Sequence, residues 1–353
     1  LLIIDGSFSK RKYSQIWNKE YIESLESDGE KIIAGAIKAS SSHNMQPWIV
    51  KKIDSMTYEL YADMSKDLAV IDSDHKQMLI SQGSFIEAFS QTAINYGYQV
   101  DVNLENMDFS TAQPLVATLK LDKKYEISNA DAVSSSSVNP KASEKGLDSV
   151  KEEVEKSLAL YPSLDYDLVS ENDLESFKAI LLMGTEIESR NQAATEELLK
   201  IFRWTERDKN KFRYGLALNN MSPIMQPLIQ PIMKVFPSTW QVFGEQGIDA
   251  FKTRLESEKG YLLIKSSATN PKDYIYVGRL YQILSQNVGG YIIRPAVQVL
   301  ETFDDMKDVN QAFQSEYGDT ETVMLIIGLQ ELGSDTSRSR PAPRHLVEDI
   351  LIH

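Results

Sequence analysis

The chain has no cysteine and only four histidines among its 353 residues, and each scarcity excludes a kind of chemistry. Without thiols there is no disulfide, no thiolate metal ligand and no cysteine nucleophile. None of the histidines is paired at metal-ligand spacing and no HExxH occurs, so we predict no metal site. The patterns G-x-S-x-G, G-x-G-x-x-G and the P-loop are also missing, which removes the usual signals of a serine hydrolase, a Rossmann site and a nucleotide triphosphate site.

Positive charge is scarce as well: 37 Lys and Arg residues stand against 51 Asp and Glu, a formal net charge of −14. An acidic surface repels nucleic-acid phosphates and anionic lipids, so we expect neither nucleic acid nor a membrane as partner. No apolar run reaches the length of a membrane span. We therefore expect a soluble chain whose compartment stays open, cytoplasmic or exported after loss of an N-terminal segment.

Helical and strand-like patterns alternate through the first part of the chain. A serine-rich, almost wholly polar stretch then follows at 122–142, which predicts a linker or an exposed loop. We place the boundary between two halves there, as residues 1–130 and 131–353. The elements predicted before it are helices at 10–25, 28–39 and 73–96, and strands at 49–53, 57–62, 98–104 and 115–121.

The second half repeats this alternation, with predicted helices at 143–160, 171–203 and 272–288 and strands at 165–169, 261–265, 291–293 and 322–329. Two helix ends also look alike. One reads Asn95-Tyr96-Gly97-Tyr98 and the other reads Asn287-Val288-Gly289-Gly290-Tyr291, each between a strand–helix unit and a further strand. This similarity indicates internal repetition, although unrelated helix ends can coincide by chance.

Residues 40–48, reading Ser-Ser-Ser-His-Asn-Met-Gln-Pro-Trp, are the most informative segment. Small side chains let a flat ligand approach the backbone, and the amides of Asn44 and Gln46 can both donate and accept hydrogen bonds. Pro47 fixes the backbone and Trp48 offers a large apolar anchor. A polar loop that caps a helix has the same composition, so the residues alone leave both interpretations open.

The segment resembles the flavin-contacting motif of the nitroreductase family, FMN-dependent oxidoreductases that are usually homodimers. Taken with the internal repetition, the chain resembles the fused branch of that family, in which one polypeptide imitates the dimer. The resemblance implies an α+β fold of two pseudo-symmetric repeats, each with a mostly antiparallel sheet flanked by helices. It also implies a monomer that binds one FMN, because the motif occurs only in the first half.

By the same resemblance, the loop would contact the flavin and late arginines of the second half would bind its phosphate. The segment 134–142, which matches an arginine-rich stretch of the family, has lost its arginines, so serines and Lys141 would have to serve there. The arginines at 338–344 match better, although a solvated tail has the same composition. The cofactor-binding residues implied are Ser41, Ser42, His43, Asn44, Gln46, Arg338, Arg340 and Arg344.

Residues 215–245 are rich in Met and Pro, which prevents one continuous helix and gives a soft apolar surface. This segment is either a structural cap or a lid over the flavin.

The resemblance implies an oxidoreductase that passes hydride through flavin N5, from NAD(P)H to an electron-poor small molecule, without a catalytic side chain. The alternatives are a non-catalytic FMN-binding or FMN-sequestering protein, and a chain that has lost flavin and keeps the fold for protein contact.

Overall fold

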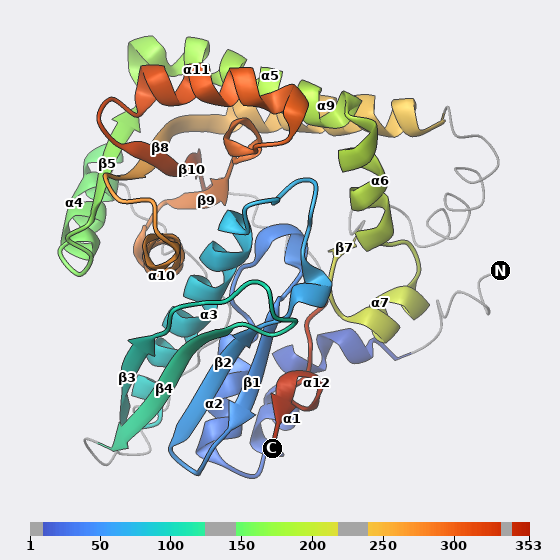
Figure 1. The fold of residues 1–353 in the computed structure, drawn as a ribbon, viewed down its shortest axis with the longest axis vertical. Helices are drawn as coiled ribbons and strands as arrows, with labels where there is room; N and C mark the ends of the chain where they lie inside the picture. The colour runs from blue at the N-terminus through green and yellow to red at the C-terminus, as the bar shows by residue number, and fades with distance from the viewer. Residues whose placement is uncertain (1–9, 124–145, 218–238, 333–340) are drawn as a thin grey trace.

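A computed structural model describes residues 10–123, 146–217, 239–332 and 341–353, without the side chains of 239–243. These residues form two larger, mostly antiparallel sheets with helices between and around them, and a small parallel sheet of two strands (Figure 1). The architecture is the mixed α+β arrangement that the sequence predicts. The predicted linker at 122–142 and most of the Met- and Pro-rich segment lie outside the described residues.

The first sheet has the strand order β11-β1-β2-β4-β3. All neighbours are antiparallel except β11, which comes from the chain end and runs parallel to β1, with Val50 opposite Leu351. More and less buried residues alternate along β2 and β3, as expected of a sheet with one solvated face. The strands are β1 (Trp48–Lys52), β2 (Thr57–Ala62), β3 (Tyr98–Leu104), β4 (Leu115–Lys123) and β11 (Leu351–Ile352).

The second sheet is wholly antiparallel and has the order β5-β8-β10-β9. β8 and β10 are buried along nearly their whole length because helices cover both faces. On one face, α5 (Leu174–Arg190), α9 (Thr239–Ser257) and α11 (Lys307–Tyr317) enclose an apolar cluster that includes Phe177 and Tyr261. The strands are β5 (Leu164–Val169), β8 (Glu258–Ser266), β9 (Tyr291–Pro295) and β10 (Thr322–Glu331).

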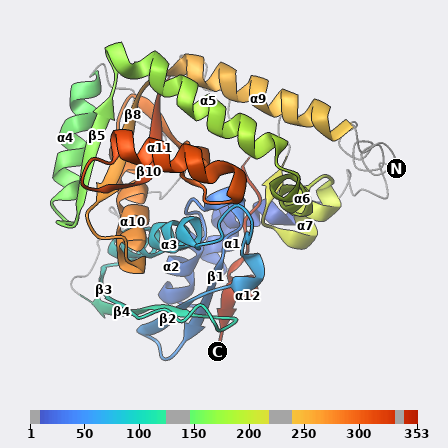
Figure 2. The same cartoon turned by 45° about the horizontal axis from the view of Figure 1, so that its top comes forward.

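Two long helices, α3 (Lys76–Asn95) and α10 (Pro271–Asn287), lie side by side between the sheets (Figures 1 and 2). They approach so closely that a Cβ atom on Gly83 would overlap the carbonyl oxygen of Ile275, and one on Gly278 would overlap that of Ile80. The crossing therefore requires glycine on both helices. One continuous apolar core surrounds it and includes residues of both sheets.

Apart from β11, the two sheets share one arrangement. The order β1-β2-β4-β3 corresponds to β5-β8-β10-β9, with α3 between β2 and β3 and α10 between β8 and β9. The glycines that follow these helices, Gly97 and Gly290, have nearly equal φ angles of 80° and 81°. The similar helix ends in the sequence thus occupy the same place in the two strand orders.

Two helices predicted as continuous are broken at an asparagine. Residues 10–25 form η1 (Lys12–Trp17) and α1 (Lys19–Glu23) on either side of Asn18. Residues 171–203 break at Asn191, whose side chain accepts a hydrogen bond from the backbone N–H of Ala194 at 2.9 Å. Asn191 thus caps α6 and ends α5. Asn18 has the same extended backbone before α1 but makes no side-chain capping bond.

The remaining elements connect these layers. They are α2 (Asp28–Ala36), η2 (Ser42–Asn44), η3 (Met64–Lys66), α4 (Leu147–Leu158), η4 (Glu171–Asp173), α6 (Gln192–Ile201), β6 (Phe202–Arg203), α7 (Glu206–Phe212), β7 (Leu216–Ala217), η5 (Gln298–Leu300), η6 (Asp304–Met306) and α12 (Val347–Ile350). No helix in the described ranges has the length and apolar character needed to cross a bilayer.

Candidate functional site

The loop at 40–47 connects α2 to β1 through an unusually contorted turn. His43, Asn44 and Gln46 have φ angles of 46°, 57° and 51°, in the left-handed region that costs free energy for residues other than glycine. Such a backbone persists only where its surroundings hold it. Trp48 anchors the end of the loop, because it is fully buried and packs against Phe85 with ring centroids 5.0 Å apart.

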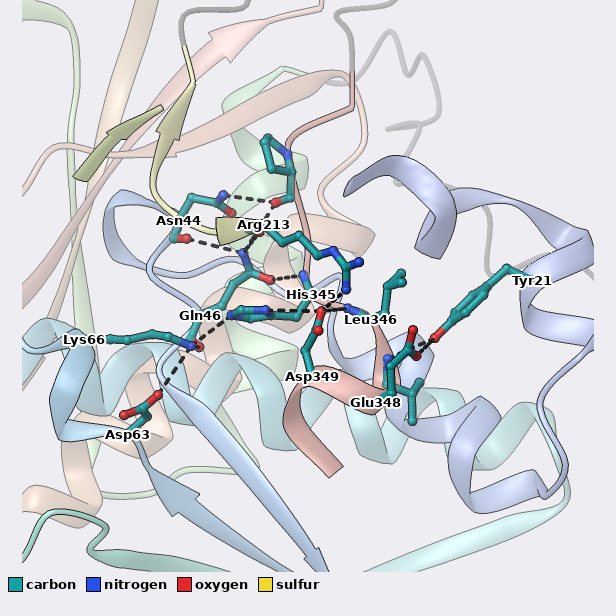
Figure 3. Close-up of polar contacts among 12 residues, drawn as sticks. Tyr21, Asn44, Gln46, Asp63, Lys66, Arg213, His345, Leu346, Glu348 and Asp349 are labelled. Carbon is teal, nitrogen blue, oxygen red and sulfur yellow. Dashed lines mark hydrogen bonds and ion pairs between the residues drawn. The ribbon is translucent and has the colours of Figure 1, made fainter. Parts of the chain in front are cut away.

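The side chain of Asn44 faces the C-terminal segment, defined here as residues 343–349 (Figure 3). Its Nδ2 donates to the carbonyl oxygens of Gly215 at 3.1 Å and Pro343 at 3.0 Å. Its Oδ1 accepts a hydrogen bond from Nη1 of Arg344, whose Nη2 also lies 3.4 Å from the carbonyl oxygen of Ala39. Both ends of the amide are therefore occupied by protein groups.

Gln46 is fully buried and joins the same two segments (Figure 3). Its Nε2 donates to the carbonyl oxygen of Arg213 at 2.9 Å, and its Oε1 accepts from the backbone N–H of His345 at 2.9 Å. A buried amide that satisfies two backbone groups stabilises the loop against 213–215 and against the C-terminal segment. The side chain therefore serves the fold directly.

Charged groups continue this network below Gln46. Nζ of Lys66 lies 2.9 Å from Nε2 of His345 and 3.4 Å from a carboxylate oxygen of Asp63. An ammonium group can only donate, so Nε2 accepts and the neutral imidazole carries its proton on Nδ1, 3.6 Å from Asp349. Burial lowers the pKa of both Lys66 and His345, which agrees with a neutral ring.

Asp349 forms an ion pair with Nη1 of Arg213 at 2.5 Å and accepts the backbone N–H of Leu346 at 2.8 Å. Burial by itself would raise the pKa of this carboxyl. The nearby ring of His345, together with the hydrogen bonds from Leu346 and Arg213, outweighs burial and holds the pKa of Asp349 well below its ordinary value. The carboxylate is thus charged at neutral pH and holds α12 and α7 together.

On its other side the loop borders a cavity of about 320 Å³. Residues of the first half line one wall: Ser40, Ser41, Ser42, His43, Gln77, Ile80, Ser81 and Ser84. Residues of the second half line the opposite wall: Tyr281, Pro295, Val297, Gln298 and Leu325. The cavity thus lies between elements of the two halves.

The polar lining is rich in hydroxyl and amide groups. The backbone N–H of Ser42 donates to Oγ of Ser81 at 3.0 Å, and Oγ of Ser42 donates to Oε1 of Gln77 at 2.5 Å. Burial lowers the pKa of His43 to about 4, so its imidazole is neutral at pH 7. Among the lining residues that are described, no side chain is charged at that pH, which suits an uncharged polar ring with apolar faces.

The predicted cofactor residues divide into three groups. Ser41, Ser42 and His43 line the cavity. Asn44, Gln46 and Arg344 are brought together, but their side-chain hydrogen bonds go to other protein groups. Arg338 and Arg340 lie outside the described residues.

Several lining residues were not predicted from the sequence. Gln77, Ser81 and Ser84 lie four and three residues apart on α3, so a polar stripe on an otherwise apolar helix could have indicated them. No comparable signal marks Tyr281 or Gln298, which reach the cavity only through tertiary packing. Within the described ranges, no group of three His, Asp or Glu side chains could hold a metal ion.

Comparisons with known proteins identify neither a family nor a ligand for this chain. No family model and no curated protein matches the chain. The crystal structure of a candidate nitroreductase from Anabaena variabilis aligns with 78% of this chain and 69% of its own, at 8% identity and a TM-score of 0.32. A likeness at this score does not assign a family or a ligand. The cavity and the residues that line it are therefore the features of this chain that bear on its function.

Proposed function

We propose that the chain is an FMN-binding oxidoreductase of the nitroreductase type, with the flavin ring in the cavity beside the serine loop. The observation that carries this proposal is the cavity itself, which lies between the Ser40–His43 loop and residues of the second sheet. Its volume of about 320 Å³ falls within the range of small-molecule sites, and its lining combines apolar surface with a few polar groups.

The lining residues would have distinct tasks. The serine hydroxyls and the amides of Gln77 and Gln298 offer donors and acceptors to the edge of a heterocycle. Ile80, Val297 and Leu325 offer apolar contact to its faces. Bound FMN supplies hydride acceptance and release at its own N5, so no side-chain acid or base is required of the protein.

The residues fit the ring of FMN better than its phosphate. Burial lowers the pKa of Arg344 to about 10, but its guanidinium still carries a charge and is bonded to Asn44. Contact with a phosphate would have to replace that bond. We therefore propose that Asn44, Gln46 and Arg344 shape the loop, while Ser41, Ser42 and His43 contact the ring.

We further propose that the two halves are fused repeats and that the chain works as a monomer. The shared strand order, with one long helix at the same point in each sheet, supports this reading. The molecular mass in solution tests it, since a monomer of 39.9 kDa is expected. A stable dimer would contradict the proposal that the chain works as a monomer. The proposal of fused repeats depends on the strand orders, which the molecular mass does not test.

A second candidate is a protein that holds FMN without turnover. The hydrogen bond between Arg344 and Asn44 favours this second candidate. It ties the loop beside the cavity to the C-terminal segment, and a loop held in this way need not move to admit a second substrate. Steady oxidation of NADH or NADPH with a nitroaromatic or quinone acceptor separates the two candidates. Bound FMN without turnover would favour the second.

The direct test is the absorbance spectrum of the purified protein, followed by titration of the apoprotein with FMN. Val297→Trp places a large ring in the cavity and should abolish flavin binding. Leu160→Trp, at an exposed position outside the cavity, is the matched control and should bind as the wild type does. A colourless protein that stays apo with FMN would refute both candidates.

A further inference from the structure

The contact between Lys66 and His345 joins the first half of the chain to the C-terminal segment, and the proposed function makes no use of it (Figure 3). Nζ of Lys66 lies 2.9 Å from Nε2 of His345, and the two residues are only 9% and 7% exposed. An ammonium group has three donors and no acceptor, so a protonated imidazole could not accept its hydrogen bond. This distance therefore allows a single positive charge on the two side chains together.

The two carboxylates at this contact are already paired with other cations. Asp349 lies 3.6 Å from Nδ1 of His345 but forms its ion pair with Arg213, at 2.5 Å. Nδ1 itself has no hydrogen-bond partner among the residues that the structure describes. On the opposite side, Asp63 pairs with Lys66 at 3.4 Å. Neither carboxylate is therefore free to balance a second charge on the imidazole.

The same contact supports the 40–48 loop from behind. Nζ of Lys66 also donates to the carbonyl oxygen of Gln46 at 3.4 Å, and the backbone N–H of His345 donates to Oε1 of Gln46 at 2.9 Å. A void of about 10 Å³ borders Lys66 and is also lined by Ser42 and Ser81, which line the cavity as well. A movement at Lys66 can therefore reach the cavity wall through these two serines.

We propose that protonation of His345 breaks its contact with Lys66, releases the C-terminal segment from the 40–48 loop and thereby disturbs the cavity wall. The cause is repulsion between two buried cations at hydrogen-bond distance. The left-handed backbone at Asn44 and Gln46, which persists only while its surroundings hold it, is then able to relax. The cavity is thus intact at neutral pH and disturbed in acid, whatever the identity of its ligand.

The pH range follows from the charges that face the imidazole. Burial lowers the pKa of His345, and the charges of Lys66 and Arg213 lower it further, while Asp349 offsets this only in part. The folded chain therefore resists a proton that the opened chain takes up below about pH 6.5, the ordinary value of histidine. Opening should become more frequent below that pH. His43 is a second buried histidine, with a pKa lowered to about 4, so the variants compared below all keep it.

Nitrogen NMR of the four histidine rings tests the protonation state in the wild type. At pH 7 the ring of His345 should be neutral and should carry its proton on Nδ1. A charged ring at that pH, or a neutral ring with the proton on Nε2, would overturn the inference. This measurement needs no variant to fold.

Amide hydrogen exchange of the full chain tests the release. From pH 6 to pH 5, opening at residues 44–48 and 343–349, corrected for the intrinsic exchange rate, should rise about tenfold or more in the wild type. Lys66→Met removes the second cation, so the rise should be about tenfold smaller. His75→Gln, which changes a histidine paired elsewhere, is the control and should keep the wild-type rise. An equal rise in Lys66→Met and the wild type, or no rise in the wild type, would overturn the inference.

Discussion

The two sides of the 40–48 loop make opposite use of similar polar side chains. On the side of the C-terminal segment, the amide groups of Asn44 and Gln46 form hydrogen bonds with backbone groups of 213–215 and 343–345. On the cavity side, the hydroxyl and the backbone N–H of Ser42 bond to the side chains of Gln77 and Ser81, and Ser42 still lines the cavity. A single motif therefore holds the fold together on one side and lines the cavity on the other.

The two sides also differ in how their carboxyl groups are treated. Asp349 has an arginine and a backbone N–H, so its pKa is lowered. Burial raises the pKa values of Glu188 on α5 and of Glu301, directly after η5, and within the described ranges neither carboxyl has an arginine or a backbone N–H as a hydrogen-bond partner. Acid should therefore weaken the C-terminal side, and base should weaken the cavity side. Four substitutions test this difference between the two sides.

The largest effect is expected from Gln46→Leu. The variant leaves the backbone groups of His345 and Arg213 buried without partners, which should cost about 2–4 kcal/mol of unfolding free energy. Gln77→Leu on the cavity side should cost less than about 1 kcal/mol, since that side chain is only partly buried. Urea unfolding measures both. Equal losses would contradict the division between the two sides.

Asp349→Asn should lower the unfolding free energy by about 1–2 kcal/mol at pH 7, through loss of the ion pair with Arg213. The pKa of Asp349 is lower in the folded than in the unfolded chain. The stabilisation is therefore present above about pH 4, the unfolded value, and disappears as the pH falls toward the folded value. Thermal unfolding should show the variant and wild type converging near pH 2. A constant difference from pH 7 to pH 2 would exclude this role.

Glu301→Gln should have the opposite pH dependence. Because burial raises the pKa of Glu301 on folding, the folded chain retains its proton, and stability falls as the pH rises from about 4.5, the unfolded value, toward the raised folded value. The variant should be more stable than the wild type by about 1 kcal/mol at pH 8.5 and nearly equal at pH 5. Denaturant midpoints at the two pH values measure this. Destabilisation at pH 8.5 would show that the carboxylate is compensated after all.

The smallest effect on stability is expected from Ser42→Ala. The hydroxyl donates one hydrogen bond at the cavity wall, so its loss should cost about 0.5–1 kcal/mol. If the cavity holds the flavin, the affinity for FMN should fall by a factor of a few, as measured by quenching of flavin fluorescence. An unchanged affinity, with a stability loss as large as that of Gln46→Leu, would place Ser42 on the structural side of the comparison.

Much of the fold could be predicted from residue patterns. The strand at 98–104 and the long helix ending before Gly97 follow from alternation, helical spacing and a glycine that permits positive φ. The breaks at Asn18 and Asn191 do not follow from the pattern, because an apolar stripe continues across an asparagine whose extended backbone separates two helices. The identity of FMN as ligand and the roles of Arg338 and Arg340 remain predictions.

Local residue types alone were enough to predict a polar 40–48 loop anchored by a large apolar tryptophan. The left-handed backbone at His43, Asn44 and Gln46 was not predicted. The direction in which each polar group of this loop faces depends instead on packing between distant parts of the chain. Asn44 and Gln46 turn from the cavity because carbonyl and N–H groups some 170 and 300 residues away need buried partners. Glu188 and Glu301 are likewise buried only where α5 and η5 pack together, since nothing in their separate neighbourhoods along the chain indicates that burial.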